Sequence, residues 1–374
     1  MNIVVDAHML GEAEGGNETY VAGLLRGLAP VAPAWGALVT ALIGPSGDRH
    51  LDPLLPIQRY PVGRRGDAWR VFAEVPRACR RLKADVVHMT YNAAPWLPCP
   101  LVLSVHDVLF RRYPEYFTPP VRFLLSTVLP MSMRRASVVL TISEASRRDI
   151  AHFYPFTRNK ITVVSLAAGP VAEVEPDLQS SFRYGQRRPF VLAVGGIQPR
   201  KNLRRLIEAY LLLRRQGATD AGLVLVGRAE WQSKSIQDLA GRSEYAKDVC
   251  LTGYVDAATL AGLYRQCAVF AYPSLGEGFG LPVLEAMACG APVITSNVSS
   301  LPEVAGEAAL LVDPLSVDQI AGGIDRVLHD PTLREDLRRQ GARQAARFSW
   351  EKTALGTLAA YRMASAKGNA RADM

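Results

Sequence analysis

Two glutamates, Glu277 and Glu285, flank a glycine-rich turn that is predicted to open a helix. Pro282 suits the first helical position because it has no amide hydrogen to lose there, and Gly290 suits the left-handed backbone after the last turn. The amides before Pro282 therefore lie at a helix N-terminus, where phosphate and sugar oxygens bind well. Carboxylates beside such a site need hydrogen-bond donors, and sugar and ribose hydroxyls are the natural ones.

A basic pair follows a predicted strand earlier in the same half of the chain. The apolar run 190–195 leads to Arg200 and Lys201. A departing diphosphate needs cations because its charge must be neutralised for the bond to break. Arginine offers a fork of donors and lysine a mobile point charge. Two basic residues ahead of a helix are in isolation simply surface, so the phosphate interpretation depends on the two glutamates that follow.

The first half offers weaker candidates. His106 ends the apolar run 101–105, where a histidine is usually structural. The loop Gly15-Gly16 precedes a predicted helix, so its amides could face a diphosphate or an acceptor, with a plain turn as the alternative. Four polar residues that follow other strands are acceptor-side candidates only: Tyr91, Asn92, Ser143 and Glu144.

The elements that carry these residues alternate between short apolar runs and helical stretches, which is typical of parallel α/β architecture. The predicted strands are 3–5, 38–43, 86–89, 101–105 and 137–142, then 190–195, 222–227, 249–252, 269–272, 293–295 and 310–312. Two such sets predict two Rossmann-like, doubly wound domains, 1–170 and 171–349, with the boundary near 166–188 and a last helix capped by Ser349. Ligands of such sheets bind beyond the carboxyl ends of the strands, which the candidates follow.

Composition sets the expected compartment. The 374 residues suit two domains, and no apolar run reaches the roughly 18 residues of a transmembrane helix. The first residues read as a strand and not as a signal peptide. Five scattered cysteines fit a reducing cytoplasm, so we expect a cytoplasmic protein.

Positive charge is concentrated in the first half. The net charge is +8, and residues 1–170 hold 19 Lys or Arg against 13 Asp or Glu. Basic doublets occur at 64–65, 80–81, 111–112, 134–135 and 147–148. Without zinc-ligand spacing or a basic-aromatic signature, nucleic acid is not an expected partner. Peripheral contact with an anionic membrane and plain solvated faces both remain open.

The segment 273–293, Pro-Ser-x-x-Glu-Gly-Phe-Gly-Leu-Pro-x-x-Glu-Ala-Met-Ala-Cys-Gly-x-Pro-Val, resembles the signature of retaining, nucleotide-sugar-dependent glycosyltransferases of the GT-B type, family 4. The resemblance implies two Rossmann-like domains facing across a cleft, with a final helix 350–374 that packs back on the first. Pro-Arg-Lys-Asn at 199–202 is similar to a subgroup of bacterial mannosyltransferases of surface polysaccharide synthesis. Many family members have an arginine where this chain has Gly196, which leaves open how Arg200 and Lys201 share the diphosphate.

The resemblance also implies a role for each candidate. Lys201 is expected to be the essential cation beside Arg200, and His106 to meet the donated sugar. Glu277 would bind that sugar's hydroxyls, and Glu285 the ribose diol. Backbone groups would frame the base at Gly253, Tyr254 and Val255 and meet the sugar and β-phosphate at Phe279, Gly280 and Leu281.

The implied reaction transfers a hexose from a nucleoside diphosphate sugar, GDP-mannose first and UDP-hexoses next, to a saccharide or lipid-linked saccharide. The leaving phosphate oxygen takes the acceptor proton. The chain has no Asp-x-Asp motif, and its histidines lack zinc-type spacing with cysteine, so we expect neither metal nor cofactor. A nucleotide-sugar epimerase, a phosphorylase and a catalytically silent GT-B subunit are the alternatives.

Overall fold

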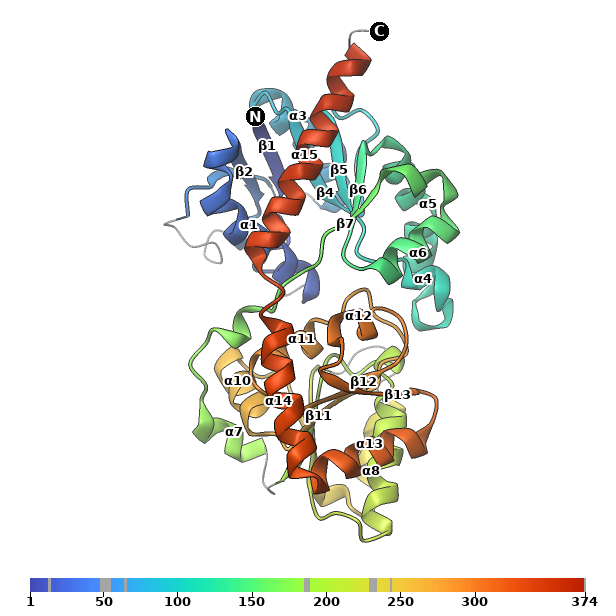
Figure 1. Cartoon of the computed structure of the whole chain (residues 1–374). Helices are drawn as coiled ribbons and strands as arrows, with labels where there is room; N and C mark the ends of the chain where they lie inside the picture. Colours follow the sequence, from blue (N-terminus) through green and yellow to red (C-terminus); the bar gives the residue numbers. More distant parts are fainter. Residues whose placement is uncertain are drawn as a thin grey trace. The chain divides into compact units, whose positions relative to one another are not determined.

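The computed structural model describes residues 1–12, 15–47, 55–63, 66–184, 189–228, 234–242 and 244–372. His50, the doublet Arg64-Arg65 and residues 185–188 of the expected boundary lie outside these ranges. The chain forms two compact units (Figure 1): unit 1 is Met1–Ala167 with Ser349–Met374, and unit 2 is Ala168–Phe348. Unit 1 thus breaks at Ala167, where the sequence placed the boundary after residue 170.

Unit 1 is built on a seven-stranded parallel sheet in the order β3-β2-β1-β4-β5-β6-β7. The strands are β1 (Asn2–Asp6), β2 (Leu38–Ile43), β3 (Gln58–Pro61), β4 (Val86–Thr90), β5 (Leu101–Ser104), β6 (Val138–Thr141) and β7 (Ile161–Val163). The central strands are buried on both faces, as parallel strands between helices must be. The edge strands β3 and β7 were not predicted, because neither presents a long apolar run.

The α-helices described in unit 1 are α1 (Gly16–Val31), α2 (Asp67–Trp69), α3 (Val75–Arg81), α4 (Leu109–Arg112), α5 (Pro119–Arg135), α6 (Glu144–Phe153) and α15 (Trp350–Ala372), and a π-helical turn, Arg70–Glu74, lies between α2 and α3. From its apolar pattern the sequence predicts one uninterrupted helix, 68–82, where the structure has α2, the π-helical turn and α3. Within the π turn, Arg70 is buried and pairs with Asp6 at the end of β1.

The C-terminal helix α15 packs along α1 in unit 1 (Figure 1). A Cβ at Gly23 would meet the Trp350 ring at 2.2 Å, and one at Gly27 would meet the Trp350 carbonyl oxygen at 2.2 Å. Only glycine at these two positions permits so close an approach. Ser349 begins the helix as predicted, accepting a hydrogen bond from the amide of Lys352 at 3.2 Å.

Unit 2 repeats the architecture with a six-stranded parallel sheet, β10-β9-β8-β11-β12-β13. Its strands are β8 (Phe190–Val194), β9 (Gly222–Val226), β10 (Val249–Gly253), β11 (Val269–Tyr272), β12 (Val293–Ser296) and β13 (Ala309–Val312). Its helices are α7 (Leu178–Tyr184), α8 (Leu203–Arg215), α9 (Lys234–Arg242), α10 (Ala257–Gln266), α11 (Leu281–Ala288), α12 (Leu301–Ala305), α13 (Val317–His329) and α14 (Pro331–Ala345).

Each unit has its own apolar core beneath its helices. In each sheet the strand order reverses once, between β1 and β4 in unit 1 and between β8 and β11 in unit 2. The predicted pair of doubly wound α/β domains is therefore confirmed, and ligands of such sheets bind at these reversals. Across the described residues, no helix combines the length and apolar character needed to cross a bilayer.

Candidate functional site

The reversal in the sheet of unit 2 brings three predicted residues together. Arg200 and Lys201 occupy a 3₁₀ turn, Pro199–Lys201, that follows β8, and Glu277 lies in the loop after β11. β8 and β11 are hydrogen-bonded neighbours, so residues far apart in sequence leave the sheet side by side. Neighbouring strands that turn away in opposite directions open a crevice at this point.

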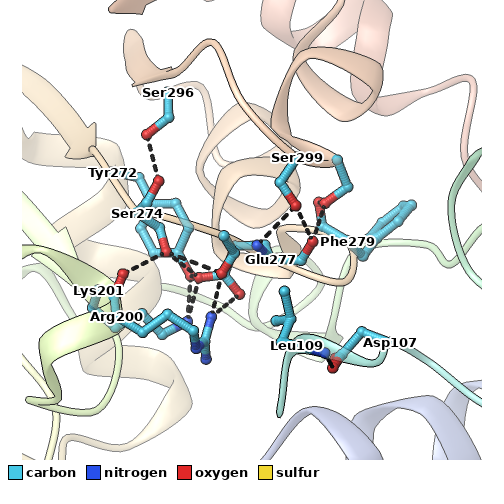
Figure 2. Close-up of polar contacts among 12 residues, drawn as sticks. Asp107, Leu109, Arg200, Lys201, Tyr272, Ser274, Glu277, Phe279, Ser296 and Ser299 are labelled. Carbon is cyan, nitrogen blue, oxygen red and sulfur yellow. Dashed lines mark hydrogen bonds and ion pairs between the residues drawn. The ribbon is translucent and has the colours of Figure 1, made fainter. Parts of the chain in front are cut away.

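Glu277 is the centre of this cluster (Figure 2). Its Oε1 accepts hydrogen bonds from Lys201 Nζ at 2.8 Å, Ser274 Oγ at 2.6 Å and the Tyr272 hydroxyl at 2.9 Å. Its Oε2 lies 2.9 Å from Nη1 of Arg200. Three side chains proposed for one donor molecule therefore form a single buried ion-pair network, which we call the Glu277 cluster.

The charge of Glu277 is fixed by its neighbours. Burial alone would raise the pKa of this carboxyl group. The charges of Arg200 and Lys201, with hydrogen bonds from Lys201 and Ser274, outweigh burial and hold the pKa well below its ordinary value. Glu277 is therefore ionised at neutral pH.

The loop that carries Glu277 is held by serines and by one asparagine. Ser299 and Ser300 donate to the Glu277 carbonyl at 2.6 and 2.9 Å, and Ser300 also lies 2.7 Å from the Phe279 carbonyl. Asn202, buried at the start of α8, donates to the Pro273 carbonyl at 2.9 Å. These bonds position the loops after β8 and β11 against each other.

The glycine-rich turn then opens α11 in the predicted way, with one shift. Gly280 has φ of +115°, which disfavours any side chain there, and Leu281 is the first helical residue. Pro282 consequently occupies the second position and not the first, where its missing amide hydrogen is still not needed. The backbone at Phe279, Gly280 and Leu281 thus lies at the N-terminus of α11, as expected for groups that meet a phosphate or a sugar.

Glu285, the second glutamate, lies on α11 and does not join the Glu277 cluster. It accepts from the backbone amide of Gly169, and the Tyr264 hydroxyl is 3.5 Å from its Oε2. Burial raises the pKa of Glu285 to about 7, and the two hydrogen bonds oppose that rise. The two glutamates therefore have opposite tendencies, one held ionised and one close to protonation at neutral pH.

The residues expected to frame the base lie at the carboxyl end of β10, with Gly253 as its last residue. Tyr254 is 69% exposed, and the Arg228 guanidinium lies 4.8 Å from the centre of its ring. Gly253 accepts at its carbonyl from Gly227, and Val255 is buried. Arg228 was missed by the sequence reasoning, although its place directly after β9 is the same signal that identified Arg200.

Unit 1 carries His106, which lies just beyond β5 and is 5% exposed. Its Nδ1 is 3.0 Å from Oδ1 of Asn17, and the Tyr20 ring stands edge-on to it at 4.6 Å. An amide oxygen only accepts, so Nδ1 carries the proton and Nε2 is the acceptor. Nε2 is buried and has no hydrogen-bond partner within the described ranges. Burial lowers the pKa of His106 to about 4, so the ring is neutral at neutral pH.

The predicted glycine loop of unit 1, Gly15-Gly16, lies at the start of α1. Gly15 has φ of +59° and precedes the helix, and Gly16 is its first residue. Glu18 in the first turn accepts from the Gly11 amide at 2.8 Å. Asn17, which the sequence reasoning left as part of a loop, is the residue that connects this helix start to His106.

The acceptor-side candidates differ from one another. The Tyr91 ring stands edge-on to His106 at 5.7 Å, and the Asn92 amide donates to the Thr90 carbonyl at 2.7 Å. Ser143 accepts from the Ser146 amide at 3.0 Å and caps α6, and Glu144 pairs with Arg147 at 2.6 Å. Both residues thus contact their own helix, and their assignment to the acceptor side stays a prediction. Among the residues that the structure describes, no group of three or more His, Cys, Asp or Glu side chains is placed to hold a metal ion.

Sequence families cover almost the whole chain. The profile described as "Glycosyltransferase Family 4" matches residues 14–167, and "Glycosyl transferases group 1" matches residues 176–344. O-antigen chain mannosyltransferase B of Escherichia coli is 36% identical over 268 residues, 70% of each chain. Serotype-specific mannosyltransferase WbdA of Escherichia coli is 32% identical over 227 residues, which are 59% of this chain and 28% of WbdA.

Solved structures share the fold at lower identity. Sucrose-phosphate synthase from Thermosynechococcus elongatus superposes with a TM-score of 0.76 at 22% identity, covering 97% of this chain and 98% of that one. Anabaena HepE in complex with UDP and glucose gives 0.70 at 18% identity, covering 96% and 98%. With the family profiles and the Escherichia coli relative, these findings show that the chain belongs to the family 4, or group 1, glycosyltransferases and has the GT-B fold.

Proposed function

We propose that this glycosyltransferase transfers mannose from a nucleoside diphosphate mannose to a saccharide or lipid-linked saccharide during surface polysaccharide synthesis. GDP-mannose is the donor that we favour. The observation that carries the proposal is the Glu277 cluster, in which two cations and a carboxylate meet at the sheet reversal of unit 2. The sequence identity of 36% to an Escherichia coli O-antigen mannosyltransferase supports mannose as the sugar.

In the proposed reaction Arg200 and Lys201 neutralise the departing diphosphate. Both cations contact Glu277 in the structure, so the site has its charges arranged in advance and need not reorganise them during bond cleavage. Oε1 of Glu277 already accepts three hydrogen bonds, so a hydroxyl of the donated sugar would be accepted at Oε2, which Arg200 shares.

The other residues bind and orient. Glu285 accepts from the ribose diol, Tyr254 and its neighbours frame the base, and amides at the start of α11 meet the sugar and β-phosphate. Nε2 of His106 accepts from a hydroxyl of the sugar, and the neutral ring steadies the positive charge that develops at the reacting carbon.

We propose retention of configuration without a metal. The acceptor hydroxyl approaches on the side from which the diphosphate leaves, its oxygen bonds to the sugar carbon as the carbon–oxygen bond to phosphate breaks, and a leaving phosphate oxygen takes its proton. This route needs no protein base, and two fixed cations do the work for which other enzymes use a divalent ion.

A donor screen followed by product analysis tests these assignments. Purified protein is heated with GDP-mannose, UDP-glucose or ADP-glucose, and the matching nucleotide should raise the melting temperature most. Transfer is then measured with the best donor, with and without EDTA, and the anomeric configuration of the product is read by NMR. Inversion or dependence on metal would refute the mechanism, and epimerised donor or binding without transfer would refute the function.

A further inference from the structure

The helix α5 lies in unit 1 (Figure 1). It exposes large apolar side chains to solvent. The exposed fractions are 75% for Phe123, 57% for Met131, 54% for Leu124 and 44% for Val121. Phe123, Thr127 and Met131 recur at every fourth position, so they lie along one side of the helix. The opposite side packs on the core through Leu129 and Met133. Burying such an outer face in an apolar phase would be favourable, and clusters of this kind mark interaction sites.

The charge of the same helix has one sign. Its 17 residues include three arginines and no acidic residue. Arg122 and Arg134 are exposed, and the Arg134 guanidinium lies 4.6 Å from the ring centre of Phe156, which is itself 41% exposed. Of the nearby acids, Asp149 is already paired with Arg112, while Glu115 is exposed in the turn before α5. The face is therefore apolar along its centre and positive at its two ends.

We propose that this face, the α5 patch (Val121, Arg122, Phe123, Leu124, Met131 and Arg134), rests on an anionic lipid membrane. The apolar side chains would enter the acyl region and the arginines would stay at the headgroups, as in interfacial helices. Tyr113 and Tyr116, stacked just before α5, are of the type that favours the headgroup level.

A second copy of the chain fits the patch less well. A two-fold dimer through α5 would set arginines of one helix against arginines of the other, with no acidic residue on either helix to neutralise them. An anionic bilayer supplies both the apolar phase and the neutralising charge. The inference goes beyond the proposed transfer reaction and does not depend on it, because membrane binding is measured without donor or acceptor.

Vesicle binding by the full-length protein is the test. We expect sedimentation with phosphatidylglycerol–phosphatidylcholine vesicles, little with phosphatidylcholine alone, and weaker binding at high salt. Phe123→Ser with Leu124→Ser should lower the partition coefficient at least about tenfold. Arg122→Glu removes one positive charge and adds a negative one, and should lower it by about fivefold or more. Leu315→Ser in unit 2, where the side chain is 63% exposed, is the matched control and should change nothing.

A fluorescent reporter gives a result that does not depend on loss of binding. Phe123→Trp should show a blue shift with anionic vesicles and quenching by brominated lipids, whereas Leu315→Trp should show neither. The double variant should keep the melting temperature and the transfer rate to a soluble acceptor. Equal binding by wild type and the double variant would overturn the proposal. A dimer that the double variant dissociates, with no vesicle binding by wild type, would assign the patch to a second copy.

Discussion

Glu277 in unit 2 and His106 in unit 1 are both buried, but only Glu277 keeps its charge at neutral pH. In unit 2, Glu277 is buried and stays ionised because Arg200 and Lys201 surround it. In unit 1, His88 and His106 are buried with polar partners that bring no compensating charge of comparable effect, and burial lowers the pKa of His88 to about 3 and that of His106 to about 4. Burial penalises charge in both places, and the supply of counter-charge decides the outcome.

Four polar residues buried in unit 1, His88, Ser104, Tyr20 and Tyr361, form a chain of neutral hydrogen bonds. His88 contacts Ser104 Oγ at 2.7 Å and the Tyr361 hydroxyl at 2.6 Å, and Tyr20 contacts Ser104 at 2.7 Å. This chain of hydrogen bonds ties α1 and α15 to the sheet and so is structural. The comparison teaches that unit 2 places a compensated set of charges at the site proposed for the diphosphate, while the site residue predicted in unit 1, His106, is neutral.

The largest effect should follow from removing a cation of the Glu277 cluster. Lys201→Ala removes a positive charge that would neutralise the leaving diphosphate. It also leaves the negative charge of Glu277 with one counter-charge fewer, so kcat/KM should fall by about 10²–10³-fold. Lys201→Arg should recover part of the loss. Lys234→Ala changes an exposed lysine on α9 of the same unit and should leave the rate unchanged. If Lys201→Ala transferred mannose at the wild-type rate, the charges of the Glu277 cluster would not be needed for the reaction.

Acid should weaken unit 1 before unit 2. The folded pKa values of His88 and His106 lie below the ordinary 6.5, so the unfolded chain binds more protons, and stability is full above pH 6.5 and is lost as pH falls. By pH 4, the protonation of each histidine in the unfolded chain can lower the free energy of unfolding by up to about 3 kcal/mol. The lowered pKa of Glu277 instead protects unit 2 until the pH falls below the ordinary glutamate value of 4.5.

Tryptophan fluorescence during urea unfolding reports unit 1 in a Trp231→Phe background, because the other four tryptophans, Trp35, Trp69, Trp96 and Trp350, all lie in unit 1. His88→Gln should be less stable at pH 7 and should depend less on pH between 6.5 and 4. Hydrogen exchange reports unit 2. If unit 2 opened first on acidification, the assigned charge states would be wrong.

Asn17 is a positioning residue for His106, and its replacement should have a smaller effect. Asn17→Ala removes the acceptor that holds the proton of His106 on Nδ1, so Nε2 is no longer fixed as a hydrogen-bond acceptor. Activity should fall by about 10- to 100-fold. Asn17→Asp places a carboxylate at Nδ1 and favours the imidazolium form, so it should raise the pKa of His106 and move the acid limb of the pH–rate profile to higher pH. A merely structural role would lower the rate of both variants without moving that limb.

The sequence predicted the elements that bury continuous apolar runs. The sequence predicts helices at 203–215, 257–266 and 317–329, and the bounds of α8, α10 and α13 match them, because apolar periodicity and flanking caps agree there. β3 escaped prediction because Gln58-Arg59-Tyr60-Pro61 is half exposed at a sheet edge and ends in proline. The π turn at Arg70–Glu74 escaped because the Asp6 partner of Arg70 lies 64 residues away in sequence.

The site shows the same limit. Glu277, Lys201 and Arg200 were predicted as site residues because each follows a strand and has chemistry that a sugar diphosphate needs. Their direct contact could not be predicted, since it depends on which strands are neighbours. Asn17 and Arg228 were missed for the same reason. The amide of Asn17 and the guanidinium of Arg228 become site candidates only once the fold places them beside His106 and Tyr254.

The smallest predicted effect concerns Glu285. Burial raises its pKa to about 7, so about a tenth of the carboxyl groups are ionised at pH 6 and about nine tenths at pH 8. A ribose diol donates best to a carboxylate, so the KM for the donor should fall by up to about tenfold over this range. Glu285→Gln should bind the donor more weakly and with no pH trend. If the variant kept the wild-type trend, another group would be responsible.

A stability measurement sharpens the same point because its sign is the reverse of that for Glu277. A folded pKa above the ordinary 4.5 means that the stabilising contribution is full below pH 4.5 and is lost as pH rises through 7. Free unit 2 should therefore lose stability between pH 6 and 8, and bound donor should restore it by supplying hydroxyl donors to the carboxylate. The melting-temperature gain from saturating donor should be larger at pH 8 than at pH 6, and Glu285→Gln should show equal gains. Equal gains in the wild type would mean that the donor does not contact Glu285, which would confine the charge chemistry of unit 2 to the Glu277 cluster.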